Sequence, residues 1–430
     1  MRILRAGEEG FNRYVLEATE RIAQDPIDLG EEVRSILRDV RKRGDEALVH
    51  YTQLFDGLKV SPFELEVGRN EIRQAYRKIT QDLLKTFRKA SSRIRRFHQL
   101  TKRNLNTKWA EKGIRMEQAV RPLERVGIYI PGGKASYPST VLMAAIPAKV
   151  AGVREIVITT PPQQGGISPA VLVASDLAGA DRVYRVGGVQ AIAALAFGTK
   201  TIPRVDKIVG PGNRYVAMAK RFVFGAVDID MVAGPSEVVV ISDGKTPPDF
   251  VAADLVSQAE HDEMALCILI TPSEVFAMKV REEVERQLTS LKRERIARTS
   301  LNQRGAILIA RDLPQAMDLA NRIAPEHLEL CVKDPSPLKK AVKNAGAVFL
   351  GTHTPVAIGD YLAGPNHILP TSGTARFTSA LGVEDFFKKI NFIQFDKRRL
   401  GGFEKDLKRF TEWEGLEGHY QSVQIRMRKQ

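Results

Sequence analysis

The chain has 430 residues, of which 43% are hydrophobic and 27% charged, an ordinary composition for a soluble α/β protein with two or three domains. Its two cysteines, Cys267 and Cys331, lie in apolar runs and are too few for a disulfide framework, so we expect a reducing, cytoplasmic setting. The acidic N-terminus excludes a signal peptide, and Pro147 and Lys149 break the longest apolar run, so no membrane partner is expected.

The net charge of +14 raises the question of nucleic-acid binding. The positive excess falls in residues 1–125 and 388–430, whereas residues 126–387 are nearly balanced. In the densest basic stretch, 85–97, apolar residues recur at helical spacing and the basic residues fall on the other face. No aromatic side chains interleave with the charges to stack on bases. We interpret this stretch as a solvated helix face and expect no nucleic-acid partner.

The predicted elements change in character near residue 125. Residues 8–104 are predicted to be helical, with breaks at Gly57 and Gly68. Strands then alternate with helices, which predicts parallel βαβ units and a covered sheet. The first series has strands at 126–130, 155–160, 182–186 and 205–209 and helices at 139–150, 169–177, 189–197 and from 213 to 222. The second has helices at 248–260, 273–292, 312–323 and 335–344 and strands at 264–271, 306–310, 328–332 and 347–350.

We therefore predict an α/β fold with two Rossmann-like domains, a helical N-terminal region and a C-terminal arm. The similar size of the two series suggests an old duplication. The expected segments are 1–25 (helical), 26–128 with 238–381 (first α/β domain, with the metal and catalytic residues), 129–237 (second α/β domain, binding NAD) and 382–430 (arm, poor in strands). Sites in such sheets lie at the C-terminal ends of strands and in crevices between domains.

Three glycine-containing turns follow predicted strands in the first series, at 131–133, 187–188 and 210–213. Glycines at the start of a helix let backbone N–H groups approach a phosphate. Ordinary βα turns remain the alternative for each loop taken alone. Three such loops in one unit, with Tyr129, Gln190 and Asn213 at their edges, favour a bound adenine dinucleotide.

Gln258 and His261 lie three residues apart at the end of a predicted helix, so their side chains share one face. A carboxamide oxygen and an imidazole nitrogen can hold part of a metal's coordination shell, although a plain polar helix end is the alternative. Asp360 between glycines and His419 in a glycine-containing tail are candidates to complete a mixed N/O zinc site.

Glu326 and His327 are adjacent at the entrance to a predicted strand. A carboxylate and an imidazole together can supply one base for a water molecule and one for an alcohol proton. A solvent-exposed helix exit is the alternative interpretation of this segment.

Taken together, these motifs resemble the histidinol dehydrogenase family, and the resemblance covers almost the whole chain. The matching segments are Pro131-Gly-Gly-Lys-Ala-Ser-Tyr-Pro-Ser139, Gly210-Pro-Gly-Asn213, Ala233-Gly-Pro-Ser-Glu237, Ser257-Gln-Ala-Glu-His261, Ala324-Pro-Glu-His-Leu-Glu329, Gly364-Pro-Asn-His367 and Glu414-Gly-Leu-Glu-Gly-His419. The resemblance implies two successive NAD-dependent oxidations, which convert L-histidinol to a bound aldehyde and then to L-histidine.

The resemblance also implies roles for individual residues. His327 would be the general base of both oxidations, and Glu326 would activate the water that hydrates the aldehyde. One Zn²⁺ per subunit would bind Gln258, His261, Asp360 and His419. The substrate would contact those four ligands together with Ser236, His327 and Glu414, and NAD would contact Tyr129, Gln190 and Asn213. The family is a homodimer that exchanges its C-terminal arms, so Glu414 and His419 would enter the partner's site.

Three other functions compete with this interpretation. A related NAD-dependent dehydrogenase of another polar alcohol is the nearest alternative. The retention of Glu414 and His419 favours histidinol, because a substrate without imidazole and amine groups has less need of them. A nucleic-acid-binding protein is suggested only by the basic helix. A metal-dependent hydrolase would leave the nucleotide loops without a role.

Overall fold

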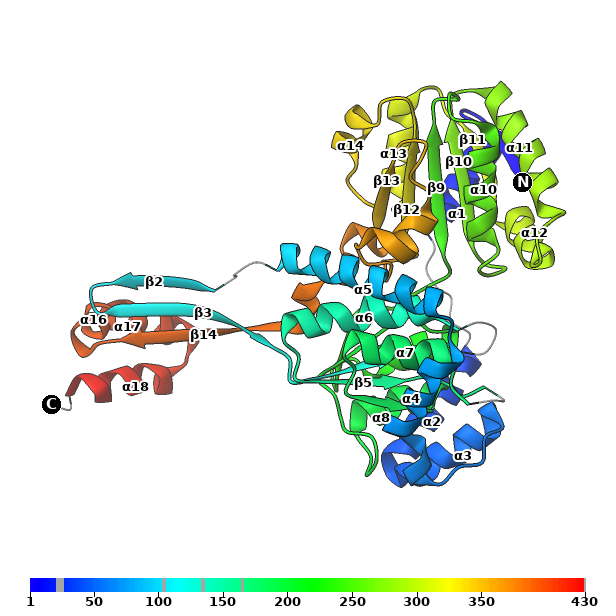
Figure 1. Cartoon of the computed structure of the whole chain (residues 1–430). Coiled ribbons are helices and arrows are strands. Elements are labelled where there is room, and N and C mark those ends of the chain that lie inside the picture. Colours follow the sequence, from blue (N-terminus) through cyan, green and yellow to red (C-terminus); the bar gives the residue numbers. More distant parts are fainter. Residues whose placement is uncertain (21–26, 103–105, 133–135, 164–165, 429–430) are drawn as a thin grey trace. The chain divides into compact units, whose positions relative to one another are not determined.

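The computed structural model describes residues 1–20, 27–102, 106–132, 136–163 and 166–428. The chain divides into two compact units (Figure 1). Unit 1 comprises Met1–Thr101 and Glu124–Phe386, and unit 2 comprises Lys102–Leu123 and Phe387–Gln430. Within the described ranges, no helix combines the length and the apolar character needed to cross a bilayer. The predicted α/β class is confirmed.

The first sheet of unit 1 has five parallel strands in the order β6-β5-β4-β7-β8. The strands are β4 (Arg125–Tyr129), β5 (Glu155–Thr159), β6 (Arg182–Tyr184), β7 (Lys207–Val209) and β8 (Asp228–Ile229). They alternate with helices α6 (Pro138–Ala151), α7 (Pro169–Ala178), α8 (Gly188–Phe197) and α9 (Arg214–Val223). The strand order reverses between β4 and β7, and such a switch point opens a crevice at the carboxyl ends of the two strands.

The second sheet of unit 1 has six parallel strands in the order β1-β11-β10-β9-β12-β13. The strands are β1 (Arg2–Arg5), β9 (Glu237–Ser242), β10 (Leu266–Thr271), β11 (Ala306–Ile309), β12 (His327–Cys331) and β13 (Ala347–Leu350). Its helices are α1 (Glu9–Thr19), α10 (Pro248–Ala259), α11 (Glu274–Leu288), α12 (Glu294–Gln303), α13 (Leu313–Ile323) and α14 (Ser336–Ala341). Apart from β1, its strands follow the same order as the five-stranded sheet, which supports the duplication hypothesis.

Both faces of the six-stranded sheet are covered, which explains the unbroken apolar runs in its strands. Every residue of β9 and β10 is buried, as parallel strands between two helical layers require. Along β9, Val239 and Ile241 face α1 and α13, whereas Val238 and Val240 face α10 and α11. Residues of β12 alternate in the same way, so Leu328 and Leu330 point away from α10.

Four helices between residues 27 and 101 pack on the side of the five-stranded sheet. They are α2 (Ile27–Arg43), α3 (Asp45–Asp56), α4 (Arg69–Lys78) and α5 (Gln81–Thr101). Val33 and Leu37 of α2 share a core with Ile192 of α8 and Val216 of α9. This packing differs from the expected grouping of residues 26–128 with 238–381. The expected helical segment 1–25 also contains β1, which pairs with β11.

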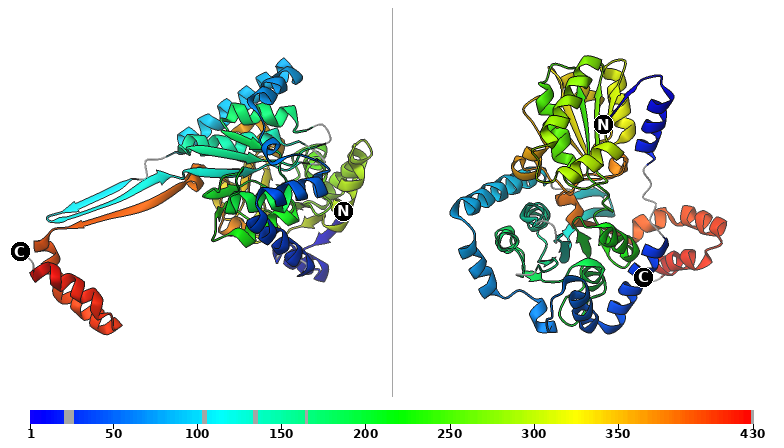
Figure 2. Two further views of the ribbon diagram at one scale, coloured as in Figure 1. Left: turned by 90° about the horizontal axis from the view of Figure 1, so that it is seen from below. Right: turned by 90° about the vertical axis from the view of Figure 1, so that its right-hand side faces the viewer.

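Unit 2 contains the predicted arm, but it is built from two separated pieces of chain. Strands β2 (Thr107–Glu111), β3 (Ile114–Pro122) and β14 (Phe387–Phe395) form an antiparallel sheet in the order β14-β3-β2 (Figure 2). Helices α16 (Lys397–Gly402), α17 (Glu404–Glu414) and α18 (Glu417–Arg428) follow. The expectation of an arm poor in strands is therefore wrong, because β14 pairs with β3 along all nine of its residues.

Candidate functional site

Glu326 and His327 lie buried where β12 begins, and both are tied to the start of β9. The Nδ1 atom of His327 lies 2.9 Å from the carbonyl oxygen of Glu237. The backbone N–H of Glu237 donates to Glu326 Oε2 at 2.8 Å, and the N–H of Glu326 donates to Glu237 Oε2 at 3.3 Å. The alternative of a solvent-exposed helix exit is therefore wrong, because the two side chains are 7% and 4% exposed.

This pair lies at the amino ends of β9 and β12, in agreement with the expected strand entrance, whereas sites in such sheets commonly lie at carboxyl ends. The helices that connect parallel strands run in the opposite direction to them. The C-terminal end of α10 therefore reaches the same edge of the sheet, and Gln258 and His261 lie there. Ser236 directly precedes β9, with its side chain partly exposed.

Asp360 lies close to His327 and occupies one turn of π-helix, η2 (Gly359–Ala363). Its Oδ1 atom is 3.8 Å from His327 Nε2, which has no hydrogen-bond partner within the described part of the chain. A π-helical turn widens the backbone and is often found at functional sites. The arrangement leaves the Nε2 lone pair or proton available to a ligand.

His367 anchors this turn, and sequence reasoning did not include it among the site residues. Its Nδ1 atom lies 2.8 Å from the carbonyl oxygen of Asp360, and its Nε2 atom lies 3.3 Å from Thr140 Oγ1. The only signal in the sequence was its place in the Gly-Pro-Asn-His segment seven residues after Asp360.

Electrostatic interactions among Glu326, His327 and Asp360 influence their pKa values. Burial raises the pKa of Glu326 to about 7. Burial acts to lower the pKa of His327, but the carboxylates of Glu326 and Asp360 outweigh it and raise that pKa to about 9. Burial acts to raise the pKa of Asp360, yet nearby imidazoles keep it below its usual value. Those imidazoles belong to His327, His367 and His261. The Asp360 carboxylate therefore interacts electrostatically with three imidazoles.

The predicted zinc ligands are distributed over both units. Gln258 is buried on α10, and none of the hydrogen bonds among the described residues involves its carboxamide. His261 follows the same helix as an exposed residue; burial of its imidazole lowers the pKa, and the charge of Asp360 opposes that shift. Glu414 and His419 belong to unit 2, where both side chains are exposed.

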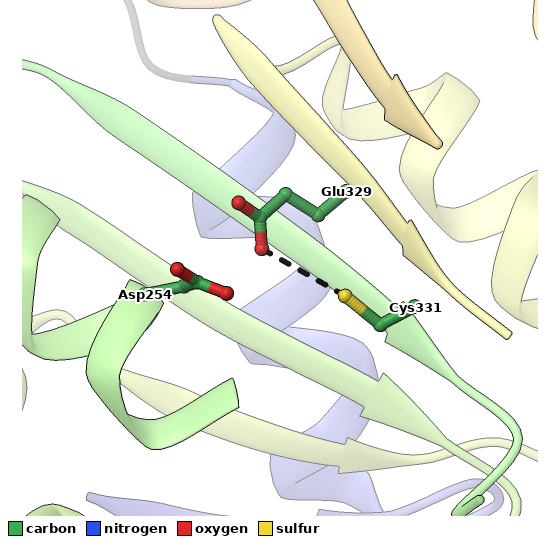
Figure 3. Close-up of side chains that lie close together, drawn as sticks. All are labelled: Asp254, Glu329 and Cys331. Carbon is green, nitrogen blue, oxygen red and sulfur yellow. Dashed lines mark hydrogen bonds between the residues drawn. The ribbon is translucent and has the colours of Figure 1, made fainter. Parts of the chain in front are cut away.

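A different trio of potential ligands is the one that lies closest together among the described residues. The side-chain atoms of Asp254, Glu329 and Cys331 lie within 4.8 Å of one another (Figure 3). Burial raises the pKa of the Cys331 thiol, and it raises that of Cys267 to about 12. Neither cysteine is therefore a ready thiolate nucleophile.

The predicted NAD residues gather around the carboxyl ends of β4, β6 and β7. The backbone N–H of Gly188 donates to the Tyr129 hydroxyl at 3.2 Å. Gln190 is buried, and neither polar atom of its carboxamide has a hydrogen-bond partner among the described residues. Gly210 adopts φ +111° so close to β4 that a Cβ would lie 2.2 Å from the Tyr129 carbonyl oxygen. Tyr129 and Gly210 therefore flank the switch point of this sheet.

Asn213 has a clear structural role at this crevice. Its Oδ1 atom accepts the backbone N–H groups of Tyr215 and Val216, both at 3.1 Å, and so caps α9. Its side chain is nevertheless exposed. The predicted turn at 131–133 lies partly outside the described residues, because these end at Gly132 and resume at Ser136.

Comparisons with known proteins agree on one family. Residues 19–427 match the family described as histidinol dehydrogenase. Histidinol dehydrogenases from Syntrophotalea carbinolica and Geobacter sulfurreducens are each 51% identical to this chain. The alignments cover 100% of the chain in both cases, with 99% and 100% of the relatives. The crystal structure of histidinol dehydrogenase from Elizabethkingia anophelis has a TM-score of 0.92 at 37% identity, covering 99% of this chain and 98% of that one.

Proposed function

Because the chain belongs to the histidinol dehydrogenase family of oxidoreductases, we propose that it oxidises L-histidinol to L-histidine in two NAD-dependent steps through a bound aldehyde. The observation that carries this proposal is the buried pair Glu326–His327 beside Asp360. His327 Nε2, which lacks a hydrogen-bond partner among the described residues, can accept the proton of the substrate alcohol when its ring is neutral, and the neutral fraction grows as the pH approaches the His327 pKa of about 9. Bound NAD supplies the oxidising power for both steps.

The second oxidation requires a water molecule to add to the aldehyde, and we assign its activation to Glu326. Burial holds the pKa of this carboxyl at about 7, near the pH at which a general base works best. His327 then removes the proton of the hydrate, as it does that of the alcohol. The contact of His327 Nδ1 with the Glu237 carbonyl keeps the Nε2 edge of the ring turned away from β9.

The donor set fits a zinc ion. Imidazole nitrogen and carboxylate oxygen are ordinary Zn²⁺ ligands, and a buried carboxamide without a hydrogen bond among the described residues is a suitable neutral one. We propose that Gln258, His261, Asp360 and His419 hold one Zn²⁺ per subunit. When bound, the ion would orient the imidazole and amine of the substrate. Ser236 and Glu414 would contact the polar and amino ends of the substrate.

We place NAD at the switch point between β4 and β7, with Tyr129, Gln190 and Asn213 as its contacts. Gln190 supports this placement, since buried polar atoms normally have partners and its carboxamide has none among the described residues. Burial raises the pKa of Tyr129 to about 12, so its hydroxyl stays neutral and can serve as a donor.

We further propose a cytoplasmic homodimer in which the arms are exchanged, so that Glu414 and His419 serve the partner's site. Large apolar side chains of unit 2 support pairing, because they would be unusual on a monomer surface. Trp413 is 94% exposed, Ile393 69% and Phe410 68%. Two buried thiols are consistent with a reducing compartment.

Initial rates with L-histidinol, NAD⁺ and added Zn²⁺ test the function. We expect two NADH per molecule of L-histidinol and loss of activity after dialysis against a chelator that Zn²⁺ restores. An absence of NADH above background would contradict the proposal. NADH from another polar alcohol alone would favour the alternative dehydrogenase, and one NADH per substrate would exclude the two-step mechanism.

A further inference from the structure

The buried carboxyl group of Glu329 contacts residues from several parts of the six-stranded sheet. Its Oε1 atom accepts the backbone N–H of Val356 at 3.0 Å. Its Oε2 atom accepts the thiol of Cys331 at 3.9 Å (Figure 3). The carboxyl group of Asp254 on α10 points toward Glu329, and an oxygen of each lies within 4.8 Å of the other.

Each contacted element also carries a candidate site residue. Glu329 lies two residues after His327 on β12, so the two side chains share one face of the strand. Asp254 lies four residues before Gln258 on α10, so these two share one face of the helix. Val356 begins α15 (Val356–Ile358), which runs directly into the π-helical turn of Asp360.

Packing alone does not explain a carboxyl group at this buried position, because an apolar side chain would fill the space without removing a polar group from water. Glu329 is 1% exposed, and burying a polar group without partners is unfavourable. Here its oxygens accept from Val356 and Cys331 and face the carboxyl group of Asp254. Burial raises the pKa of Glu329 well above its usual value and that of Asp254 to about 6. A neutral Glu329 can then donate its proton to the Asp254 carboxylate while its other oxygen accepts from Val356.

We propose that Glu329, together with Asp254, is a positioning residue that sets the relative placement of Gln258, His327 and Asp360. Glu329 joins three elements that are distant in sequence, namely α10, β12 and the segment 356–363. We call this set of contacts around Glu329 the joint. Its effect on catalysis rests on the proposed function, whereas the contacts themselves do not.

Amide hydrogen exchange on the full-length protein tests the joint without reference to activity. In Glu329→Ala, the segment 356–363 should exchange at least about tenfold faster, because the Val356 N–H loses its acceptor. In Glu329→Gln, exchange should stay within about threefold of wild type, because the amide can still accept from Val356 and donate to Asp254. Unchanged exchange of 356–363 in Glu329→Ala would overturn the proposal.

Asn321→Ala is a matched control on α13. Asn321 is also buried, and it accepts the Lys343 N–H at 2.7 Å and donates to the Ala341 carbonyl at 2.9 Å. This variant should lower the Tm and loosen residues 341–344, while it leaves exchange of 356–363 and kcat unchanged. A loss of kcat in Asn321→Ala equal to that in Glu329→Ala would mean that Glu329 acts only through general stability.

Catalysis and zinc affinity give the second readout. Removing the support of a metal site typically costs about 10–100-fold in affinity or activity, and we expect losses of that size in Glu329→Ala but not in Glu329→Gln. Equal losses in both variants would overturn the hydrogen-bonded joint. If Glu329→Ala does not fold, Asp254→Ala provides a second test. This variant should weaken zinc binding while the segment 356–363 keeps its protection against hydrogen exchange. Unchanged zinc binding in Asp254→Ala would overturn the proposal. A wild-type protein inactive on L-histidinol would refute the proposed function, whereas the exchange pattern would still decide on the joint.

Discussion

Lys220 and Asp230 form an ion pair in which both side chains are almost completely excluded from solvent. The ammonium group also donates to the carbonyl oxygen of Gly210 at 2.9 Å, and Asp230 Oδ2 accepts the Gly210 N–H at 2.8 Å. The pair thus holds both peptide groups of the glycine that packs against Tyr129. The loop that we propose to contact NAD is therefore held in place by two hydrogen bonds to one buried ion pair.

Lys220→Met should lower the free energy of unfolding by about 3–5 kcal/mol, because it leaves a buried carboxylate unpaired. The KM for NAD should rise, since the Gly210 loop loses its support. Urea denaturation and steady-state kinetics measure the two effects. Lys149, whose half-exposed side chain lies 3.8 Å from Asp181, provides the control. Lys149→Met should change the unfolding free energy by less than about 1 kcal/mol, and equal effects in the two variants would contradict the role of the buried pair.

Two substitutions of Asn213 separate helix capping from cofactor binding. Asn213→Ala removes the N-cap of α9 and should cost about 1 kcal/mol of stability, whereas Asn213→Ser keeps an accepting oxygen and should cost only a few tenths. If the carboxamide contacts NAD, both variants should raise the KM for NAD by similar factors. A normal KM in Asn213→Ser would show that the residue serves only as a cap.

His327 and Glu326 should differ in which oxidation they affect. His327→Gln should slow both oxidations by about 10²-fold or more, with zinc content retained, because it removes the general base. Glu326→Gln should slow the oxidation of the aldehyde more than that of the alcohol. Single-turnover kinetics with L-histidinol and with the aldehyde distinguish the steps. Loss of zinc from His327→Gln would make His327 a ligand, and equal slowing of both steps in Glu326→Gln would remove its role in water activation.

Exchange of the arm can be tested by mixing two inactive variants. His419→Asn and His327→Gln dimers should each be nearly inactive. After subunits mix at random, half of the dimers are hybrids, and each hybrid has one intact site if the arm serves the partner. Activity should therefore recover to about one quarter of wild type. No recovery, with subunit mixing verified by mass spectrometry, would mean that each arm serves its own chain.

His98 should make stability depend on pH. It is 1% exposed on α5, neither ring nitrogen has a hydrogen-bond partner in the described part of the chain, and burial lowers its pKa to about 4. Because the folded-state pKa lies below the unfolded one, the unfolded state binds the proton first. This contribution to stability is therefore complete above pH ~6.5 and falls by about 3 kcal/mol as the pH approaches ~4.

His98→Phe should remove this part of the pH dependence, as measured by urea denaturation between pH 7 and pH 4.5. His353→Phe, at an exposed position, should leave the pH dependence as in wild type. A wild-type slope that persists in His98→Phe would assign the effect to other groups.

Local patterns predicted most of the fold of unit 1. Alternating strands and helices were recognisable because parallel strands are continuous apolar runs bounded by glycine turns, and the predicted strands at 126–130 and 347–350 match β4 and β13 closely. The sheet of unit 2 was not predictable in this way. Its strand β14 is exposed along most of its length, so no alternation of apolar and polar residues marks it.

The candidate site was predictable only where its residues were neighbours in sequence. Glu326 with His327, and Gln258 with His261, were recognised from their spacing. The supporting contacts of Glu237, His367 and Glu329 depend on which strands and turns lie side by side. Local sequence patterns do not predict the order of strands in a sheet. Glu326 and His327 lie at the start of β12, at the strand entrance where their place in the sequence put them.

The shared strand order of the two sheets has a consequence for how the protein tolerates change. The five-stranded sheet carries its candidate ligand contacts at the carboxyl edge, and the six-stranded sheet carries them at the amino edge. In the six-stranded sheet, the turns at 243–247 and 333–335 lie at the carboxyl edge and carry none of the candidate ligand contacts. Thr246 in the first turn is buried and donates to the Cys331 carbonyl oxygen at 2.9 Å, whereas Lys333 and Asp334 in the second are exposed, so a reporter inserted at 333–335 should disturb the fold less than one at 243–247.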